Sequence, residues 1–191
     1  GTDTLTVDVA ATVETPTGLL LVALDCGIAT DVDELFDATP FETSGEYGDA
    51  GLLLEPMQRD VGKHAVFTAA DAPGELFSVD EAPRFVLLCA GTVVLLAERS
   101  KWAEGRFLAV DLDAALERVD TKARGELETI AALFSADALV PGHLGGDDQA
   151  TSVLDQLTEA SQKHAIGVSK ELRDGMRLSV EILANEVIEQ R

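Results

Sequence analysis

The segment Arg84–Asp111, RFVLLCAGTVVLLAERSKWAEGRFLAVD, contains three apolar runs separated by two breaks. The first two runs, Phe85–Cys89 and Val93–Ala97, are rich in Val and Leu, and Gly91 lies between them. Apolar, β-branched runs joined by a short turn with a permissive glycine are typical of a β-hairpin. The third run, Phe107–Val110, has the composition of another strand. This segment therefore predicts a hairpin followed by one further strand.

The residues before the hairpin predict a mixed α/β domain in which strands predominate. Leu5–Val9 alternates apolar and polar residues, as a half-buried strand does. The continuous apolar run Gly18–Leu24 predicts a central strand that is buried on both faces. Shorter strands are expected at Leu52–Leu54 and Ala65–Thr68, separated by Pro56 and Gly62, and one helical turn is expected at Asp31–Phe36.

The remaining residues predict helices. Apolar residues recur there at helical spacing, at Leu127, Ile130, Ala131 and Phe134. The dipeptide Pro141-Gly142 should end this helix. A second helix is expected to begin at Thr151 or Ser152 and to break at Gly167, and the longest one is expected to begin at Ser169.

We therefore expect two parts, a mixed α/β domain at 1–121 and a helical connector at 122–191. The last helix reaches Arg191 without a Gly, Asn or Pro stop signal, and Gly1 is not an initiator Met. Both features favour a fragment of a longer protein, in which the connector leads to a further domain.

Composition limits the classes of protein that the chain can belong to. Its net charge is -21, and twelve acidic residues precede the first basic residue, Arg59. This acidity favours a solvated acidic surface, or an acidic half that faces away from DNA or binds a basic partner. The longest apolar run is far shorter than the about 20 residues of a membrane helix, and two cysteines are too few for a disulfide framework. We expect a cytoplasmic protein with reduced thiols and no membrane partner.

The run VVLLAERSKWAEGRFLAVDLDAALERVDTKARGELETIAALFSADALVP, Val93–Pro141, resembles the N-terminal region of large bacterial adenine-specific DNA methyltransferases. These are class I, SAM-dependent enzymes of the type IIG restriction-modification and phage-defence kind. The run SQKHAIGVSKELRDGMRLSVEILANEVIEQR, Ser161–Arg191, resembles the helical connection that leads into their methyltransferase domain. Together the resemblance covers Arg84–Arg191, somewhat over half of the chain.

The resemblance implies a parent protein that uses SAM and flips an adenine out of duplex DNA. Such enzymes carry an Asn-Pro-Pro-Tyr/Phe motif and a glycine-rich SAM loop. Neither occurs in this sequence, whose sole Asn, Asn185, lies in Ala-Asn-Glu. We therefore expect no cofactor in this fragment and SAM in the parent. The expected role is scaffolding, DNA positioning through the parent, or contact with defence-system subunits.

A Mg²⁺-dependent restriction-nuclease fold is an alternative, because many N-terminal regions of such methyltransferases carry one. It requires two carboxylates for the metal and a Lys that orients the attacking water. Asp25 and Glu55 each follow an apolar run and are the candidates. The pattern is incomplete, because Pro56 follows Glu55 and Lys101 lies one position too far from Glu98. An active nuclease, a degenerate nuclease-like core and solvated carboxylates at strand ends all stay open.

Two sets of basic residues are candidates for DNA binding. Arg99, Lys101 and Arg106 surround Trp102, the only Trp, and this combination can contact phosphates and stack on a base or sugar. The other interpretation is that Trp102 packs on the sheet edge while the cations form surface ion pairs. The second set shares one side of the last predicted helix: Lys170, Arg173 and Arg177. The three histidines have no ligand spacing, so no metal site is expected.

Overall fold

The computed structural model describes residues 5–37, 49–59, 65–140, 152–161, 163, 172, 176 and 177. The chain forms two compact units, unit 1 at Gly1–Glu128 and unit 2 at Thr129–Arg191. In the described part, strands predominate over helices, and the expected mixed α/β fold is confirmed.

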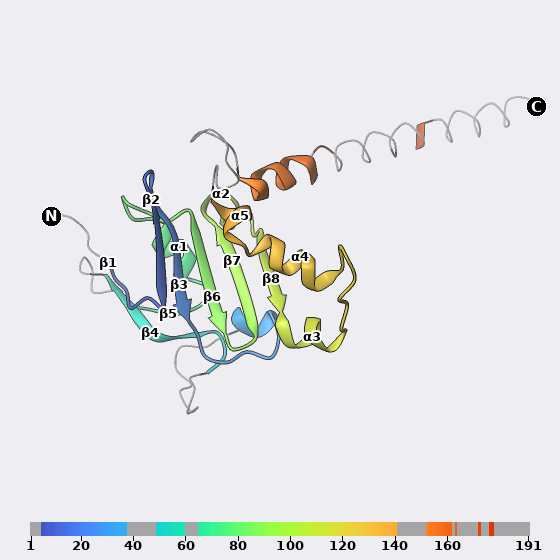
Figure 1. The fold of residues 1–191 in the computed structure, drawn as a ribbon. Helices are drawn as coiled ribbons and strands as arrows, with labels where there is room; N and C mark the ends of the chain where they lie inside the picture. Colours follow the sequence, from blue (N-terminus) through green and yellow to red (C-terminus); the bar gives the residue numbers. More distant parts are fainter. Residues whose placement is uncertain are drawn as a thin grey trace, which may run out of the picture. The chain divides into compact units, whose positions relative to one another are not determined.

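A five-stranded sheet with the order β2-β3-β6-β7-β8 dominates unit 1 (Figure 1). Its strands are β2 (Ala11–Thr15), β3 (Gly18–Asp25), β6 (Phe85–Ala90), β7 (Val93–Glu98) and β8 (Phe107–Asp111). Every neighbouring pair in this sheet is antiparallel except β3 and β6, which run parallel. The predicted hairpin is confirmed as β6 and β7, and Gly91 adopts a φ of 68° at its turn.

A second, three-stranded sheet has the order β1-β4-β5 and is antiparallel throughout. Its strands are β1 (Leu5–Thr6), β4 (Leu52–Arg59) and β5 (Ala65–Thr68). Single-residue bridges from Cys26 to Leu53 and from Gly27 to Ala50 connect the end of β3 to this sheet.

Short helices connect and follow the strands. They are η1 (Asp33–Leu35), α1 (Ala72–Phe77), α2 (Arg99–Trp102), α3 (Leu112–Glu117), α4 (Glu126–Leu133) and α5 (Ala136–Leu139). The Asp111 carboxylate accepts a hydrogen bond from the Ala114 amide at 3.0 Å, which satisfies one of the free N–H groups at the start of α3.

A large buried cluster of unit 1 lies on one face of the five-stranded sheet. Alternate residues of β3, β6 and β7 face the same side, as the period of a strand requires. They form one buried cluster with residues of β4, β5 and α1: Val22, Leu24, Val86, Leu88, Val93, Leu95, Leu53, Met57, Val66, Ala72 and Leu76. Apolar runs of four to eight residues thus become the strands that build this core.

Two strands differ in extent from the sequence prediction. The predicted strand Leu5–Val9 is confined to β1, which ends at Thr6. The predicted strand Leu52–Leu54 continues through Pro56 to Arg59. Proline fits because it lies where the register between β4 and β5 is irregular, so its missing N–H removes no regular ladder bond.

In unit 2, the predicted helix start at Ser152 is confirmed. The Ser152 hydroxyl accepts from the Asp155 amide, and the Ser152 amide donates to the Asp155 carboxylate, each at 3.2 Å. This reciprocal pair satisfies amides at the start of a helix that covers 153–161. The helix that was predicted to end at Pro141-Gly142 is wrong in extent, because α4 ends at Leu133 and the separate helix α5 follows. The predicted break at Gly167 and the helix start at Ser169 lie outside the described residues. Within the described ranges, no helix has the length and apolar character needed to cross a membrane.

Truncation of the core should cost far more stability than truncation of a surface residue of the same type. Leu88 on β6 is fully buried, whereas Leu116 on α3 is 57% exposed. We expect Leu88→Ala to lower the free energy of unfolding by about 2–5 kcal/mol and Leu116→Ala to change it by less than about 0.5 kcal/mol. Urea unfolding followed by circular dichroism measures both, and equal losses would place the core elsewhere.

Candidate functional site

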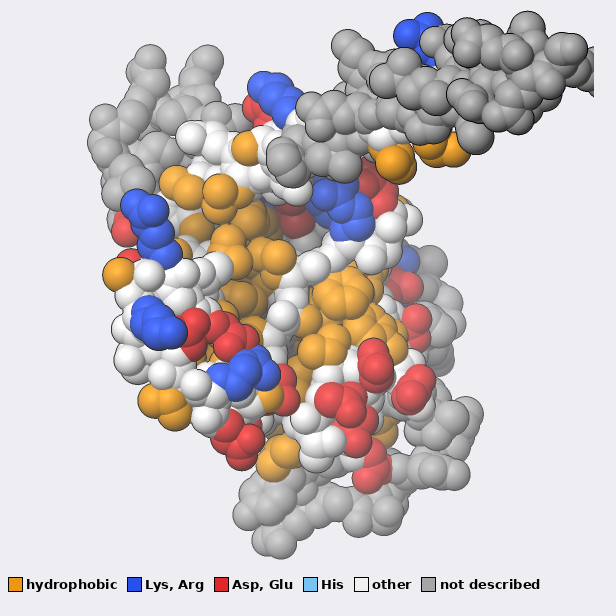
Figure 2. All heavy atoms as spheres, turned by 90° about the vertical axis from the view of Figure 1, so that its right-hand side faces the viewer, with side chains coloured by type: hydrophobic (Ala, Val, Ile, Leu, Met, Phe, Trp, Pro, Cys, Tyr) orange, Lys and Arg blue, Asp and Glu red, His pale blue; other side chains and the backbone are white. Residues whose placement is uncertain are grey.

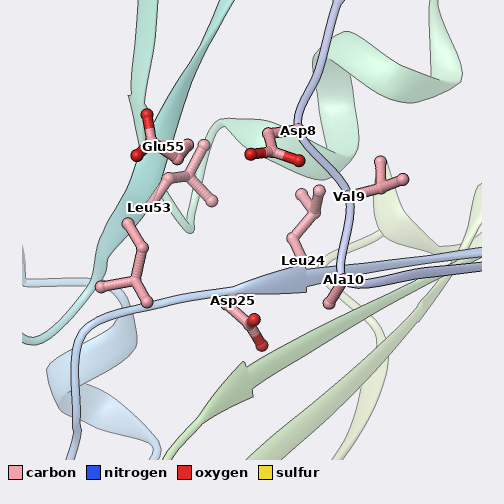
Figure 3. A pocket seen from close by; sticks show the side chains of 8 residues that line it. Asp8, Val9, Ala10, Leu24, Asp25, Leu53 and Glu55 are labelled. Atoms are coloured by element: carbon pink, nitrogen blue, oxygen red, sulfur yellow. The ribbon is translucent and has the colours of Figure 1, made fainter.

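An open pocket of about 240 Å³ lies at the end of β3, beside β4 and the segment 8–10 (Figure 3). Both nuclease candidates, Asp25 and Glu55, line it, together with a third carboxylate that the sequence analysis did not single out, Asp8. The other lining residues are Val9, Ala10, Leu24, Leu53 and Leu54. The fold therefore brings together two carboxylates that are 30 positions apart in the sequence.

The three carboxylates do not converge on one point. In Figure 3, the side chains of Asp8 and Glu55 lie on one side of the β3 ribbon, and that of Asp25 points away on the other side. The period of a strand explains this, because neighbouring side chains point to opposite faces and Leu24 takes the side of the pocket. Among the described residues, no group of three or more His, Cys, Asp and Glu could hold a metal ion.

The lysine that nuclease chemistry requires is also distant from this pocket. The strand register pairs Asp25 with Cys89 near the end of β6, whereas Glu98 pairs with Phe85 at its start. Lys101 follows Glu98 on α2, so it lies toward the opposite end of the sheet from Asp25. The described lining of the pocket contains no basic residue. Its carboxylates can attract a cation, but they lack a basic partner for activating water.

No cleavage of DNA is expected from this arrangement. With Mg²⁺ or Mn²⁺, the chain should leave supercoiled plasmid intact, because Asp25 does not share a metal position with Glu55. Gel electrophoresis after incubation over a range of metal concentrations measures this. Metal-dependent nicking that disappears in both Asp25→Ala and Glu55→Ala, with retained circular dichroism spectra, would contradict the prediction.

The two cysteines lie beside Asp25 at the junction of β3 and β6. The Cys26 amide donates to the Cys89 carbonyl at 2.8 Å, and Cys26 is buried whereas Cys89 is half-buried. Burial raises the pKa of the Cys26 thiol to about 12, and the charges of Cys89 and Asp25 contribute to the same shift. Burial and the Asp25 carboxylate also raise the pKa of Cys89. Both thiols therefore stay protonated at neutral pH and are poor nucleophiles.

The raised pKa predicts a loss of stability at alkaline pH. Below the usual thiol pKa of 9.0 the contribution of Cys26 is fully present. As pH rises from that value through the folded-state pKa of about 12, the unfolded chain ionises first and stability falls, by at most about 1.4 kcal/mol per pH unit. Urea unfolding at pH 8 and pH 10 should show a smaller decline for Cys26→Ala than for the unmodified chain. An identical decline in both proteins would contradict this prediction.

The second candidate site is the Trp102 surface, which we define as Arg99, Lys101, Trp102 and Arg106. The first three of these residues lie on the short helix α2. A tight turn follows, in which Gly105 adopts a φ of 68°. The Arg106 amide then donates to the Lys101 carbonyl at 3.2 Å, so all four residues are held together.

Trp102 packs against two phenylalanines that the sequence analysis did not connect with it. The Trp102 ring centroid lies 6.4 Å from that of Phe36 and 6.1 Å from that of Phe107, and the two phenylalanine centroids are 5.2 Å apart. Trp102 is half-buried against the core, and both phenylalanines are exposed. One part of the Trp102 indole therefore packs against the core, and the other part is accessible to a ligand.

Two cations of the Trp102 surface have local partners. The Arg99 guanidinium donates to the Ala82 carbonyl at 3.3 Å, and Arg106 pairs with Glu104 at 3.2 Å. Exposed pairs of this kind are weak and exchange readily with other anions. Arg177, from the second set of cations, is exposed in unit 2, and Lys170 and Arg173 lie outside the described residues.

Charge in unit 1 is strongly segregated along the chain. The stretch 84–106 contains four basic and two acidic residues, a net charge of +2, and it includes the Trp102 surface. The other residues of Gly1–Glu128 include five basic and 23 acidic ones, a net charge of -18. The face of the molecule in Figure 2 shows a hydrophobic patch in its right half, with Lys or Arg side chains above it and Asp and Glu side chains below it.

Comparison with known proteins gives no match: no family model, no curated protein and no solved structure is similar to this chain.

Proposed function

We propose that this chain is the N-terminal module of a SAM-dependent adenine-specific DNA methyltransferase of a cytoplasmic restriction-modification or phage-defence system. Its role there is to position DNA or partner subunits, and it contributes no methyl-transfer site. The resemblance of residues 93–141 and 161–191 to such enzymes supports the identity of the parent. The Trp102 surface supports the role of the module.

The observation that carries the positioning role is the net charge of +2 in residues 84–106 of a unit that is otherwise at -18. The rest of the unit repels a polyanion through its net negative charge, which favours approach where cations gather, as they do at the Trp102 surface. Arg99, Lys101 and Arg106 supply the phosphate contacts, and these contacts fix orientation without reading sequence.

The chemistry of methyl transfer belongs to another part of the parent. An adenine methyltransferase needs donors and acceptors that hold the exocyclic nitrogen of a flipped base. The sequence lacks the Asn-Pro-Pro motif that supplies them, and the pocket described above is lined by carboxylates and aliphatic side chains. SAM, when bound by the parent, provides the methyl group; the residues of this chain orient the duplex.

Loss of two cations from the Trp102 surface should weaken DNA binding by the full-length parent. We expect Arg99→Gln/Lys101→Gln to lower the affinity for duplex DNA and to reduce the slope of log K against log salt by about 1–2, because each lost phosphate contact removes about 0.9. Fluorescence anisotropy at several salt concentrations measures this slope. Methylation of short substrates at saturating DNA should be unchanged.

A matched control removes two exposed cations from the loop between α3 and α4. Lys122→Gln/Arg124→Gln makes the same change in net charge and should leave the salt slope unchanged. Equal effects of the two double variants would mean that only overall charge matters, and the positioning role would be wrong. Binding of SAM to the 191-residue chain in calorimetry would contradict the assignment of methyl transfer to another domain.

A further inference from the structure

The aromatic cluster of Phe36, Trp102 and Phe107 forms an apolar surface whose surroundings differ on its two sides. Phe36 is 37% exposed and Phe107 is 39% exposed, although both contact Trp102. Exposed aromatic residues that touch one another are unusual, because each would gain from burial, and such groups mark surfaces that bind a partner. The cations of the Trp102 surface lie on α2 and its turn, whereas Phe36 follows η1.

The Phe36 side of this cluster is acidic. Four acidic residues lie within the seven positions from Asp31 to Asp37: Asp31, Asp33, Glu34 and Asp37. Two of them support the backbone, because Asp31 accepts from the Glu34 amide at 3.0 Å and Glu34 accepts from the Thr30 amide at 2.7 Å. Asp33 and Asp37 are exposed. Within the described ranges, none of the four carboxylates forms an ion pair with a basic residue of this chain.

Charge complementarity selects the occupant of this side. A phosphate beside Phe36 would meet the carboxylates of Asp33 and Asp37, so the Phe36 side does not suit nucleic acid. A guanidinium group satisfies both features, because it stacks on aromatic rings and pairs with carboxylates. The chain itself contains an example of the first contact, with the Arg84 guanidinium 4.8 Å from the centroid of the Phe85 ring.

We propose that the cluster of Phe36, Trp102 and Phe107 docks an arginine-containing peptide segment of a partner protein. The guanidinium group lies against the rings and is held by Asp33 and Asp37, and an apolar neighbour in the peptide covers Phe107. The site goes beyond the DNA-positioning role proposed above, and it holds whether or not the parent methylates DNA.

The sole Trp of the chain gives a direct test, because its emission reports the environment of this cluster alone. The probe is the amidated peptide Arg-Leu-Arg-Leu-Arg, and the control probe is Glu-Leu-Glu-Leu-Glu. Titration of the 191-residue chain with the arginine peptide should shift or quench Trp102 emission in a saturable manner. The glutamate peptide should have no effect. Isothermal calorimetry of the same titrations gives an independent dissociation constant.

Variants separate the proposed contact from general attraction to an acidic protein. Asp33→Asn/Asp37→Asn should weaken arginine-peptide binding by about two- to thirtyfold, since two exposed ion pairs are lost. The control Glu14→Gln/Glu117→Gln removes two other exposed acidic residues, one on β2 at the opposite edge of the five-stranded sheet and one on α3, and should have almost no effect. Phe36→Leu keeps an apolar side chain and should also weaken binding. Circular dichroism confirms that each variant is folded.

Three outcomes would overturn the proposal. One is unchanged Trp102 emission at saturating arginine peptide. Another is equal weakening by the two acidic double variants, which would show attraction to net charge only. The last is quenching by single-stranded oligothymidylate at lower concentration than by the peptide, which would assign the whole cluster to nucleic acid. None of these outcomes bears on whether the parent binds SAM, so a failure here is distinguishable from a failure of the methyltransferase proposal.

Discussion

The parallel pairing of β3 with β6 is the constraint on which the rest of unit 1 depends. The other neighbours in the five-stranded sheet are antiparallel and follow each other in the chain, so short connections can join them. β3 and β6, in contrast, are separated by the 59 residues from Cys26 to Arg84. Those residues include β4 and β5 of the second sheet and α1, which contribute to the core on one face of the first sheet. The long connection therefore supplies the elements that pack against the first sheet.

The same pairing determines where the chemistry lies. It aligns Asp25 with Cys89 and places the apolar residues Val22 and Leu24 beside Val86 and Leu88. It also sets the pocket with its carboxylates at one end of β6 and the Trp102 surface toward the other. The two candidate sites therefore lie toward opposite ends of one sheet. The cations of the Trp102 surface cannot serve as the basic partner that the carboxylate pocket lacks.

The sequence predicted those parts of the fold that local patterns determine. The Val- and Leu-rich runs around Gly91 specified a hairpin, and the bounds of β5 at Ala65–Thr68 were predicted to the residue. β2 was not predicted, because its residues Ala11–Thr15 are nearly all exposed and carry little apolar pattern. α1 and α2 were missed because they are only six and four residues long. Strand order depends on contacts across tens of residues, which no local window contains.

The candidate site was predictable as a set of residue types and not as a geometry. Asp25 and Glu55 were singled out separately, and only the fold shows that they line one pocket while Asp25 points away from it. All residues from Leu20 to Leu24 are apolar and buried, so the sequence shows no apolar-polar alternation from which the direction of the Asp25 side chain could be inferred. The contact of Phe36 with Trp102 spans 66 positions and has no sequence signal.

The protonated thiols beside Asp25 can report local opening of unit 1 through their rates of chemical labelling. The thiolate is the form that attacks an alkylating reagent, so Cys26 reacts from conformations in which the core has opened and the thiol regains its ordinary pKa. Its labelling rate therefore measures how often β3 separates from its surroundings, much as amide exchange does. Cys89, paired with Asp25 on the neighbouring strand but only half-buried, is accessible to smaller fluctuations. The ratio of the two rates distinguishes local fraying at this strand end from cooperative unfolding of the whole unit.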